Sequence, residues 1–174
     1  MTSVSSGSWH LMMKRCRKLL VVFPLLISLN TQYRVPHFVS ITSFRRRLSD
    51  LLKVKRGVYA GAPNEICDSF KGETIEQIRQ NRDMILLNDE LVVIKLRLPD
   101  KGQRLSKANG FRLIYLAMKH VPLVTLLDLY PKRGPSQQLD IKRSEIARLV
   151  EEFKTEVKEG SLVEHDINAG LKEI

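Results

Sequence analysis

The pattern of hydrophobic and polar positions in the middle of the chain predicts a β-strand. Residues 91–98 read Leu-Val-Val-Ile-Lys-Leu-Arg-Leu. Because side chains alternate between the two faces of a strand, Lys95 and Arg97 share one face, and the hydrophobic residues Ile94, Leu96 and Leu98 share the other. Two neighbouring cations on a solvent face can form an electrostatic platform, or they can simply keep a half-exposed strand soluble.

Residues 110–133 predict a β-hairpin, because two β-rich runs flank the short turn Lys119-His-Val-Pro122. The first run carries Arg112 and Tyr115. On the second run Asp128, Tyr130 and Lys132 share parity, so they line one face if the strand extends that far. A basic loop precedes the hairpin and a further cation follows it: Lys101, Arg104, Lys107 and Arg133.

Helical periodicity appears on the N-terminal side of these strands. After a short strand at residues 38–41, Thr42 or Ser43 can cap a helix that runs from Phe44 to about Lys53. The arginine run at 45–47 lies on the polar side of this helix, either as a solvated face or as a contact to RNA. Short helical pieces follow, separated at Gly72, with these apolar positions: Ile66, Phe70, Ile75 and Ile78.

A last amphipathic helix is predicted to begin near Asp140 or Ser144, either of which can cap it, and to end at Gly160. Its apolar positions recur at helical spacing: Ile146, Leu149, Val150, Phe153 and Val157. Residues 161–174 are expected to be a loose acidic tail.

Length and charge narrow the class of protein. A chain of 174 residues suits one domain with extensions. The net charge of +10 is uneven, because residues 91–133 hold nine basic and two acidic residues. Such a patch attracts polyanions such as RNA, or it is a solvated basic face.

Residues 1–34 form a leader that we separate from the domain. Basic residues at 14–18 precede an apolar run at 19–29, as in a signal peptide. No small-residue cleavage site follows, Pro24 interrupts the run, and the run is shorter than the roughly 20 apolar residues of a membrane span. We expect no stable membrane insertion. The leader is either signal-like or the product of a start site assigned too far upstream.

Cysteine and histidine usage gives no sign of a metal or another cofactor. Cys16 and Cys67 form neither a disulfide framework nor a zinc-ligand spacing, which favours a reducing cytoplasm. Four histidines are expected at the surface of the protein or of its extensions: His10, His37, His120 and His165.

The chain resembles the RelE/ParE superfamily of bacterial toxins in three motifs. These are Lys95-Leu-Arg97, Ser106-Lys-Ala-Asn-Gly-Phe-Arg-Leu-Ile-Tyr115 and Leu126-Leu-Asp-Leu-Tyr-Pro-Lys132, and the helix start Ser144-Glu-Ile-Ala-Arg-Leu149 also fits. The resemblance implies an α+β domain over residues 35–157, followed by the acidic tail at 158–174. Its small, mostly antiparallel sheet would carry two N-terminal helices packed on one side and a C-terminal helix.

The resemblance also implies a function: a metal-independent endoribonuclease, or mRNA interferase, that acts on mRNA at the ribosome and is blocked by a cognate antitoxin. Such cleavage uses the RNA 2′-hydroxyl as nucleophile and needs a base, an acid and cations for the phosphate. The family's basic residues correspond to Lys95, Arg97 and Arg112. Its aromatic residue, which stacks a base or moves a proton, corresponds to Tyr130, with Lys132 beside it. A Lys or Tyr base would need neighbouring cations to lower its pKa.

Three alternatives remain open at this point. The chain could be a non-enzymatic poison of the ParE kind that binds DNA gyrase, since both branches share a scaffold. It could be an inactive RelE-like binding protein. Arg112 could also be structural, with a salt bridge to Asp128 across the hairpin. Pro131 leaves the aim of Lys132 uncertain, because proline fixes φ and removes a donor.

Overall fold

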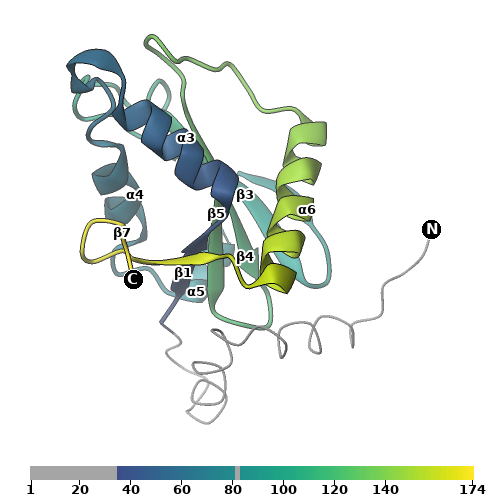
Figure 1. Cartoon of the computed structure of the whole chain (residues 1–174). Coiled ribbons are helices and arrows are strands. Elements are labelled where there is room, and N and C mark those ends of the chain that lie inside the picture. The colour runs from purple at the N-terminus through teal and green to yellow at the C-terminus, as the bar shows by residue number, and fades with distance from the viewer. Residues whose placement is uncertain (1–34, 81–82) are drawn as a thin grey trace.

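The computed structural model describes residues 35–80 and 83–174 (Figure 1). Within them a seven-stranded sheet has the order β2-β3-β4-β5-β1-β6-β7. The strands are β1 (His37–Ser40), β2 (Met84–Leu87), β3 (Leu91–Leu98), β4 (Phe111–Met118), β5 (Leu123–Pro131), β6 (Val163–Asp166) and β7 (Lys172–Glu173). The helices are α3 (Thr42–Leu52), α4 (Ala62–Phe70), α5 (Ile75–Arg79) and α6 (Arg143–Glu159), with a 3₁₀ turn at Lys55–Gly57. The prediction of an α+β fold with a mostly antiparallel sheet is confirmed, since among the described strands only β1 and β5 pair in parallel.

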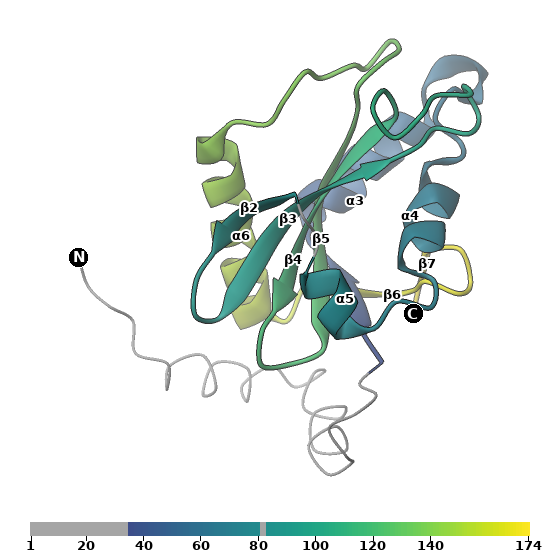
Figure 2. The same ribbon diagram turned by 180° about the vertical axis from the view of Figure 1, so that it is seen from behind.

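The helices cover both faces of the sheet, as the two opposite views show (Figures 1 and 2). Helices α3 and α6 lie on one face, where Arg47 of α3 contacts Asp128 of β5. Helices α4 and α5 lie on the other face, where the ring of Phe70 meets that of Tyr115 at 5.3 Å. The prediction of a small sheet with both N-terminal helices on one side is therefore wrong in detail.

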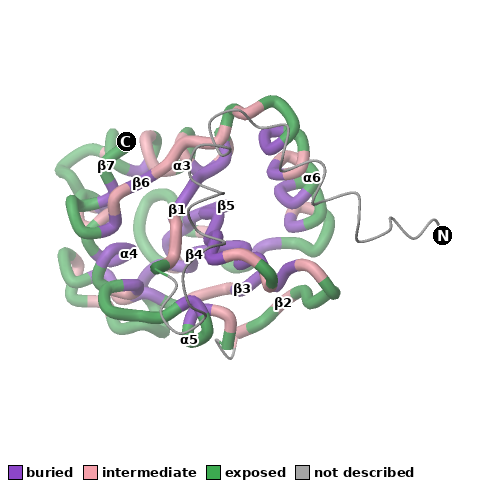
Figure 3. Tube along the Cα trace, turned by 90° about the horizontal axis from the view of Figure 1, so that it is seen from below, coloured by how far each residue is buried: buried purple, intermediate pink, exposed green. Residues whose placement is uncertain are grey.

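The predicted strand at 91–98 and the predicted hairpin are both present. Strands β4 and β5 are buried along their whole length, so helices or loops cover both of their faces (Figure 3). Tyr115 lies on the opposite face of β4 from Arg112, and its hydroxyl donates to the Ile78 carbonyl of α5 at 2.8 Å. The hairpin thus forms the centre of the core.

The prediction of a loose tail is wrong. Strand β6 pairs antiparallel with β1, and β7 pairs with β6. The ring of His165 in β6 is buried and lies 2.7 Å from the Ser40 hydroxyl of β1, with its other nitrogen 3.2 Å from the Leu171 carbonyl. The prediction that His165 lies at the surface is therefore also wrong. A polar sequence joins the sheet here because its buried polar groups bond to one another.

The predicted helix starts differ from the observed ones. Helix α3 begins at Thr42, and no side chain of its own caps it. Instead, Glu156 and Glu152 of α6 accept the Thr42 and Ser43 backbone N–H groups, each at 2.8 Å. Carboxylates favour this position because the first N–H groups of a helix lack partners and carry positive charge. Helix α6 itself follows Lys142, without a side-chain cap, and ends at Gly160 with φ 69°, as predicted.

In the part of the chain that the structure describes, no helix combines the length and apolar character that crossing a bilayer requires. The leader at 1–34, including His10 and Cys16, lies outside the described residues.

Candidate functional site

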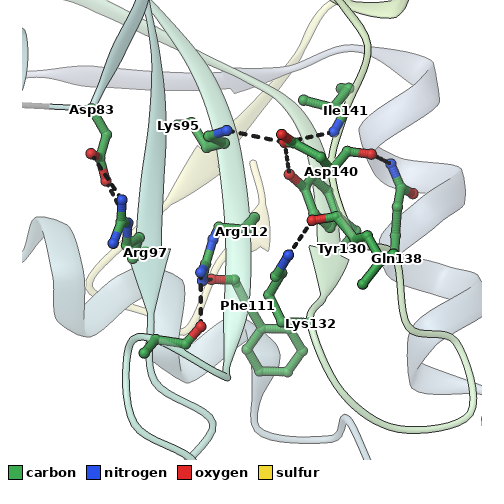
Figure 4. A network of polar contacts seen from close by, with 12 residues as sticks. Asp83, Lys95, Arg97, Phe111, Arg112, Tyr130, Lys132, Gln138, Asp140 and Ile141 are labelled. Atoms are coloured by element: carbon green, nitrogen blue, oxygen red, sulfur yellow. Dashed lines mark hydrogen bonds and ion pairs between the residues drawn. The ribbon is translucent and has the colours of Figure 1, made fainter.

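Three neighbouring strands place the predicted catalytic residues on one face. In the register, Arg97 of β3 lies opposite Arg112 of β4, and Arg112 lies opposite Tyr130 of β5. Lys95 is two residues before Arg97 and shares its face. Figure 4 shows these side chains on successive strands. We call Lys95, Arg97, Arg112, Tyr130 and Lys132 the cationic row.

Arg112 is held by backbone carbonyls. Its guanidinium donates to the carbonyls of Lys107, Ala108 and Phe111 at 2.8–3.0 Å. Burial, together with the charge of the neighbouring Arg97, lowers the pKa of Arg112. The expected alternative partner, Asp128, instead contacts Arg47 at 3.2 Å. Arg112 therefore anchors the basic loop, and it is buried, at 8% exposure.

Tyr130 is almost fully buried, at 1% exposure. Its hydroxyl lies 3.4 Å from Asp140 Oδ1, a long contact for a hydrogen bond. Burial, and next the negative charge of Asp140, raise the pKa of Tyr130. This direction is the opposite of what a tyrosinate base requires, so the hydroxyl keeps its proton and can only donate it.

Asp140 is part of the site, although its sequence position indicated only a helix cap. Its Oδ1 lies 3.0 Å from Lys95 Nζ and accepts the Ile141 N–H at 2.9 Å. The hydrogen bond from Lys95, followed by that from Ile141, lowers the pKa of Asp140. The Asp140 side chain is 68% exposed, so a ligand can reach its carboxylate.

Lys132 and Arg97 complete the row. Strand β5 ends at Pro131, and the Lys132 ammonium turns to the Leu139 carbonyl in the following loop. Arg97 is exposed and forms a 2.9 Å ion pair with Asp83. The row is thus partly neutralised by Asp83 and Asp140, one at each side (Figure 4).

The four predicted RNA-binding cations gather at the same end of β3, β4 and β5. Lys101, Arg104 and Lys107 are exposed in the loop between β3 and β4, and Arg133 is exposed after β5. Lys101 is paired with Asp68 of α4 at 2.6 Å. Arg104 takes a positive φ of 55°. The structure brings all nine predicted residues to one end of the sheet, but it places them on more than one surface.

Two grooves flank this end. One, of about 250 Å³, lies between α3 and α6, where Asp128 meets Arg47. Burial raises the pKa of Asp128. The other, of about 490 Å³, lies on the opposite face between α4, α5 and the end of β3.

Residues 35–80 and 83–174 contain no group of three or more His, Cys, Asp or Glu side chains placed to hold a metal ion. Cys67 is a buried free thiol, and burial raises its pKa. Comparison of the chain with protein-family models, with curated proteins and with solved structures gives no match.

Proposed function

We propose that the chain is a RelE-like toxin of a type II toxin–antitoxin system, and that it cleaves mRNA without a metal ion. The observation that carries this proposal is the register of Arg97 and Arg112. Like charges directly opposite each other on adjacent strands destabilise a sheet. A phosphate between or beside the two guanidinium groups would relieve that repulsion and accept charge-assisted hydrogen bonds from both.

The chemistry follows from the groups around the row. The RNA 2′-hydroxyl attacks phosphorus, the bond to the 5′-oxygen breaks, and the products are a 2′,3′-cyclic phosphate and a 5′-hydroxyl. Asp140 is ionised and exposed, so it accepts the 2′-hydroxyl proton. Lys95, 3.0 Å away, donates a proton to the leaving 5′-oxygen. Arg97 and Arg112 stabilise the charge on the phosphate oxygens.

Tyr130 has a supporting role in this scheme. Its raised pKa excludes it as a base at neutral pH. The neutral hydroxyl donates its one proton to Asp140 and so holds this carboxylate in place. The basic loop at 101–107 and Arg133 bind flanking phosphates, and the ribosome positions the message. The partners are mRNA, the ribosome and a cognate antitoxin, and the compartment is the cytoplasm.

A second candidate is a ParE-like gyrase inhibitor that cuts nothing. The contacts of Arg112 favour a protein that does not cut RNA, because this guanidinium donates to three backbone carbonyls rather than to a substrate. A RelE-like protein that binds RNA without cleaving it has the same support.

The deciding experiment expresses the full chain under an inducible promoter. In-frame cuts in a translated message, mapped by primer extension, support the nuclease. Growth arrest with intact message and inhibited DNA supercoiling supports the gyrase reading. If neither message cleavage nor inhibited supercoiling occurs, and the protein still binds RNA in a gel-shift assay, it is an inactive binding protein.

A further inference from the structure

The loop that joins β5 to α6 carries Asp140, and most of its residues are exposed. Surface loops of this kind are ordinarily more mobile than the elements that they connect. A reacting carboxylate must nevertheless keep one geometry, because a misplacement of about 1 Å can cost on the order of 100-fold in rate. The contacts that fix this loop therefore decide where the carboxylate of Asp140 lies.

Gln138 ties the two legs of the loop together. Its backbone N–H donates to the Pro131 carbonyl at 2.8 Å, and its side-chain amide donates to the Asp140 carbonyl at 3.1 Å. Beside it, the Lys132 ammonium donates to the Leu139 carbonyl. Figure 4 shows Gln138 next to Asp140 on the returning leg. The outgoing and returning legs are thus bonded to each other at the end of β5.

Tyr59 ties the tip of the same loop to the core. Its side chain is fully buried, and its ring packs edge-on against Phe111 of β4 at 5.8 Å. Its hydroxyl donates to the Arg133 carbonyl at 3.0 Å and accepts the Ser136 N–H at 3.1 Å. A Cβ atom on Gly134 would lie 2.4 Å from the hydroxyl oxygen, so the loop passes directly over the ring.

The position of Asp140 depends on these two ties. Its carboxylate meets Lys95 at 3.0 Å and the Tyr130 hydroxyl at 3.4 Å. Both partners project from strands of the sheet, whereas Asp140 itself lies on the loop. Because its side chain is 68% exposed, a loosened loop would let the carboxylate turn into water instead.

We propose that Gln138 and Tyr59 are positioning residues of the cleavage site, which hold the loop between β5 and α6 so that the carboxylate of Asp140 stands beside Lys95. They act through Asp140 rather than on the RNA. This inference rests on the proposed function, in which Asp140 is the base. It means that the base is in place before RNA binds, as preorganised catalysis requires.

Gln138→Met tests the first tie, because methionine keeps the length of the side chain and lacks the donor. The hydrogen bond from Lys95 lowers the pKa of Asp140, so a loosened loop should raise that pKa toward the ordinary aspartate value. Carboxyl-carbon NMR titration of the full chain without RNA measures it. Single-turnover cleavage should slow about tenfold with unchanged RNA affinity. Gln137→Met, an exposed change in the same loop, is the matched control and should alter neither.

Tyr59→Phe tests the second tie, because it keeps the ring and removes both bonds to the loop. It should also raise the pKa of Asp140, which a loss of overall stability would not do in the folded protein. An unchanged pKa in either variant would overturn the role of the residue replaced, and cleavage at the unaltered rate in both would overturn the inference. Because the titration needs no RNA, a raised pKa in a protein that cuts no message rejects only the nuclease.

Discussion

The ammonium of Lys95 lies 3.0 Å from the carboxylate of Asp140, and this pair joins strand β3 to the loop before α6. The two residues are 45 positions apart in the chain. Their contact places an ionised carboxylate beside the cationic row, where Tyr130 also reaches it. General acid–base cleavage of a phosphodiester needs a base that reaches the attacking hydroxyl and an acid that reaches the leaving oxygen, and we propose that Asp140 and Lys95 take these roles.

Replacing Asp140 tests its role as the base. We expect Asp140→Asn to lower the rate of message cleavage about 100-fold or more, because the amide cannot accept the 2′-hydroxyl proton. RNA affinity should stay the same or rise, since a negative charge is removed. Single-turnover cleavage and a gel shift measure the two effects. Asp89→Asn, an exposed change before β3, is the control; equal cleavage by both variants would contradict the assignment.

Arg112 is predicted to be a structural anchor as well as a phosphate ligand. Arg112→Ala removes a buried guanidinium and leaves the Lys107, Ala108 and Phe111 carbonyls without it. We expect the free energy of unfolding to fall by about 3 kcal/mol. Urea denaturation measures the loss, and the exposed Arg104→Ala in the same loop should change it by less than about 0.5 kcal/mol. A stable Arg112→Ala protein that fails to bind RNA would show that the anchor role is wrong.

Gly110 is predicted to tolerate no side chain. A Cβ atom there would lie 2.3 Å from the Leu98 carbonyl oxygen and 2.7 Å from the Asp100 backbone nitrogen. Both neighbours are backbone atoms of β3 and its loop, so they cannot turn away. Gly110→Ala should destabilise the protein by at least about 2 kcal/mol, as measured by thermal or urea unfolding. Gly61→Ala, where a Cβ atom meets nothing within 4 Å, is the matched control and should unfold like the unaltered protein.

Stability should fall in mild acid because of His165. Burial lowers the pKa of this ring in the folded protein. The unfolded chain then binds the proton more readily than the folded chain. The contribution of His165 to the free energy of unfolding is therefore complete above the unfolded pKa of about 6.5 and is lost as the pH falls below that value. Urea midpoints at pH 7.5 and pH 5.5 measure the slope.

His165→Gln provides the comparison for this pH effect. The variant should be less stable at pH 7.5 by about 1–2 kcal/mol, because the bond to Ser40 is weakened. Its midpoints should also change less between the two pH values. If both proteins show the same slope, another group causes the acid sensitivity.

Local periodicity explains which elements could be predicted. Residues 91–98, the hairpin and the helix ending at Gly160 each carry a complete strand or helix pattern within one segment. Local pattern also places Lys95 and Arg97 on one face of their strand, and Asp128 and Tyr130 on one face of theirs, because parity along a strand follows from the sequence alone. The register that brings Arg97, Arg112 and Tyr130 together across three strands does not.

The elements that were missed depend on contacts between distant segments. Residues 163–166 alternate too weakly to predict a strand, and they form one because the open edge of β1 lies beside them. Glu152 and Glu156 cap a helix more than 100 positions earlier. Asp140 lies in the loop before α6, where the sequence indicated only a helix cap, and only the folded chain brings Lys95 to it. No local propensity encodes such pairings.

The pairing of β6 with β1 has a consequence for synthesis. The ribosome makes β1 first among the described strands, but it makes β6, which covers the outer edge of β1, only after β2 to β5 and α6. Until residues 163–166 are available, a nascent chain exposes an open β-edge and lacks the bond between Ser40 and His165. Such edges invite aggregation and proteolysis. We therefore expect proteases to remove translation products that stop short of β6. The protein that accumulates should then consist of chains that include this strand.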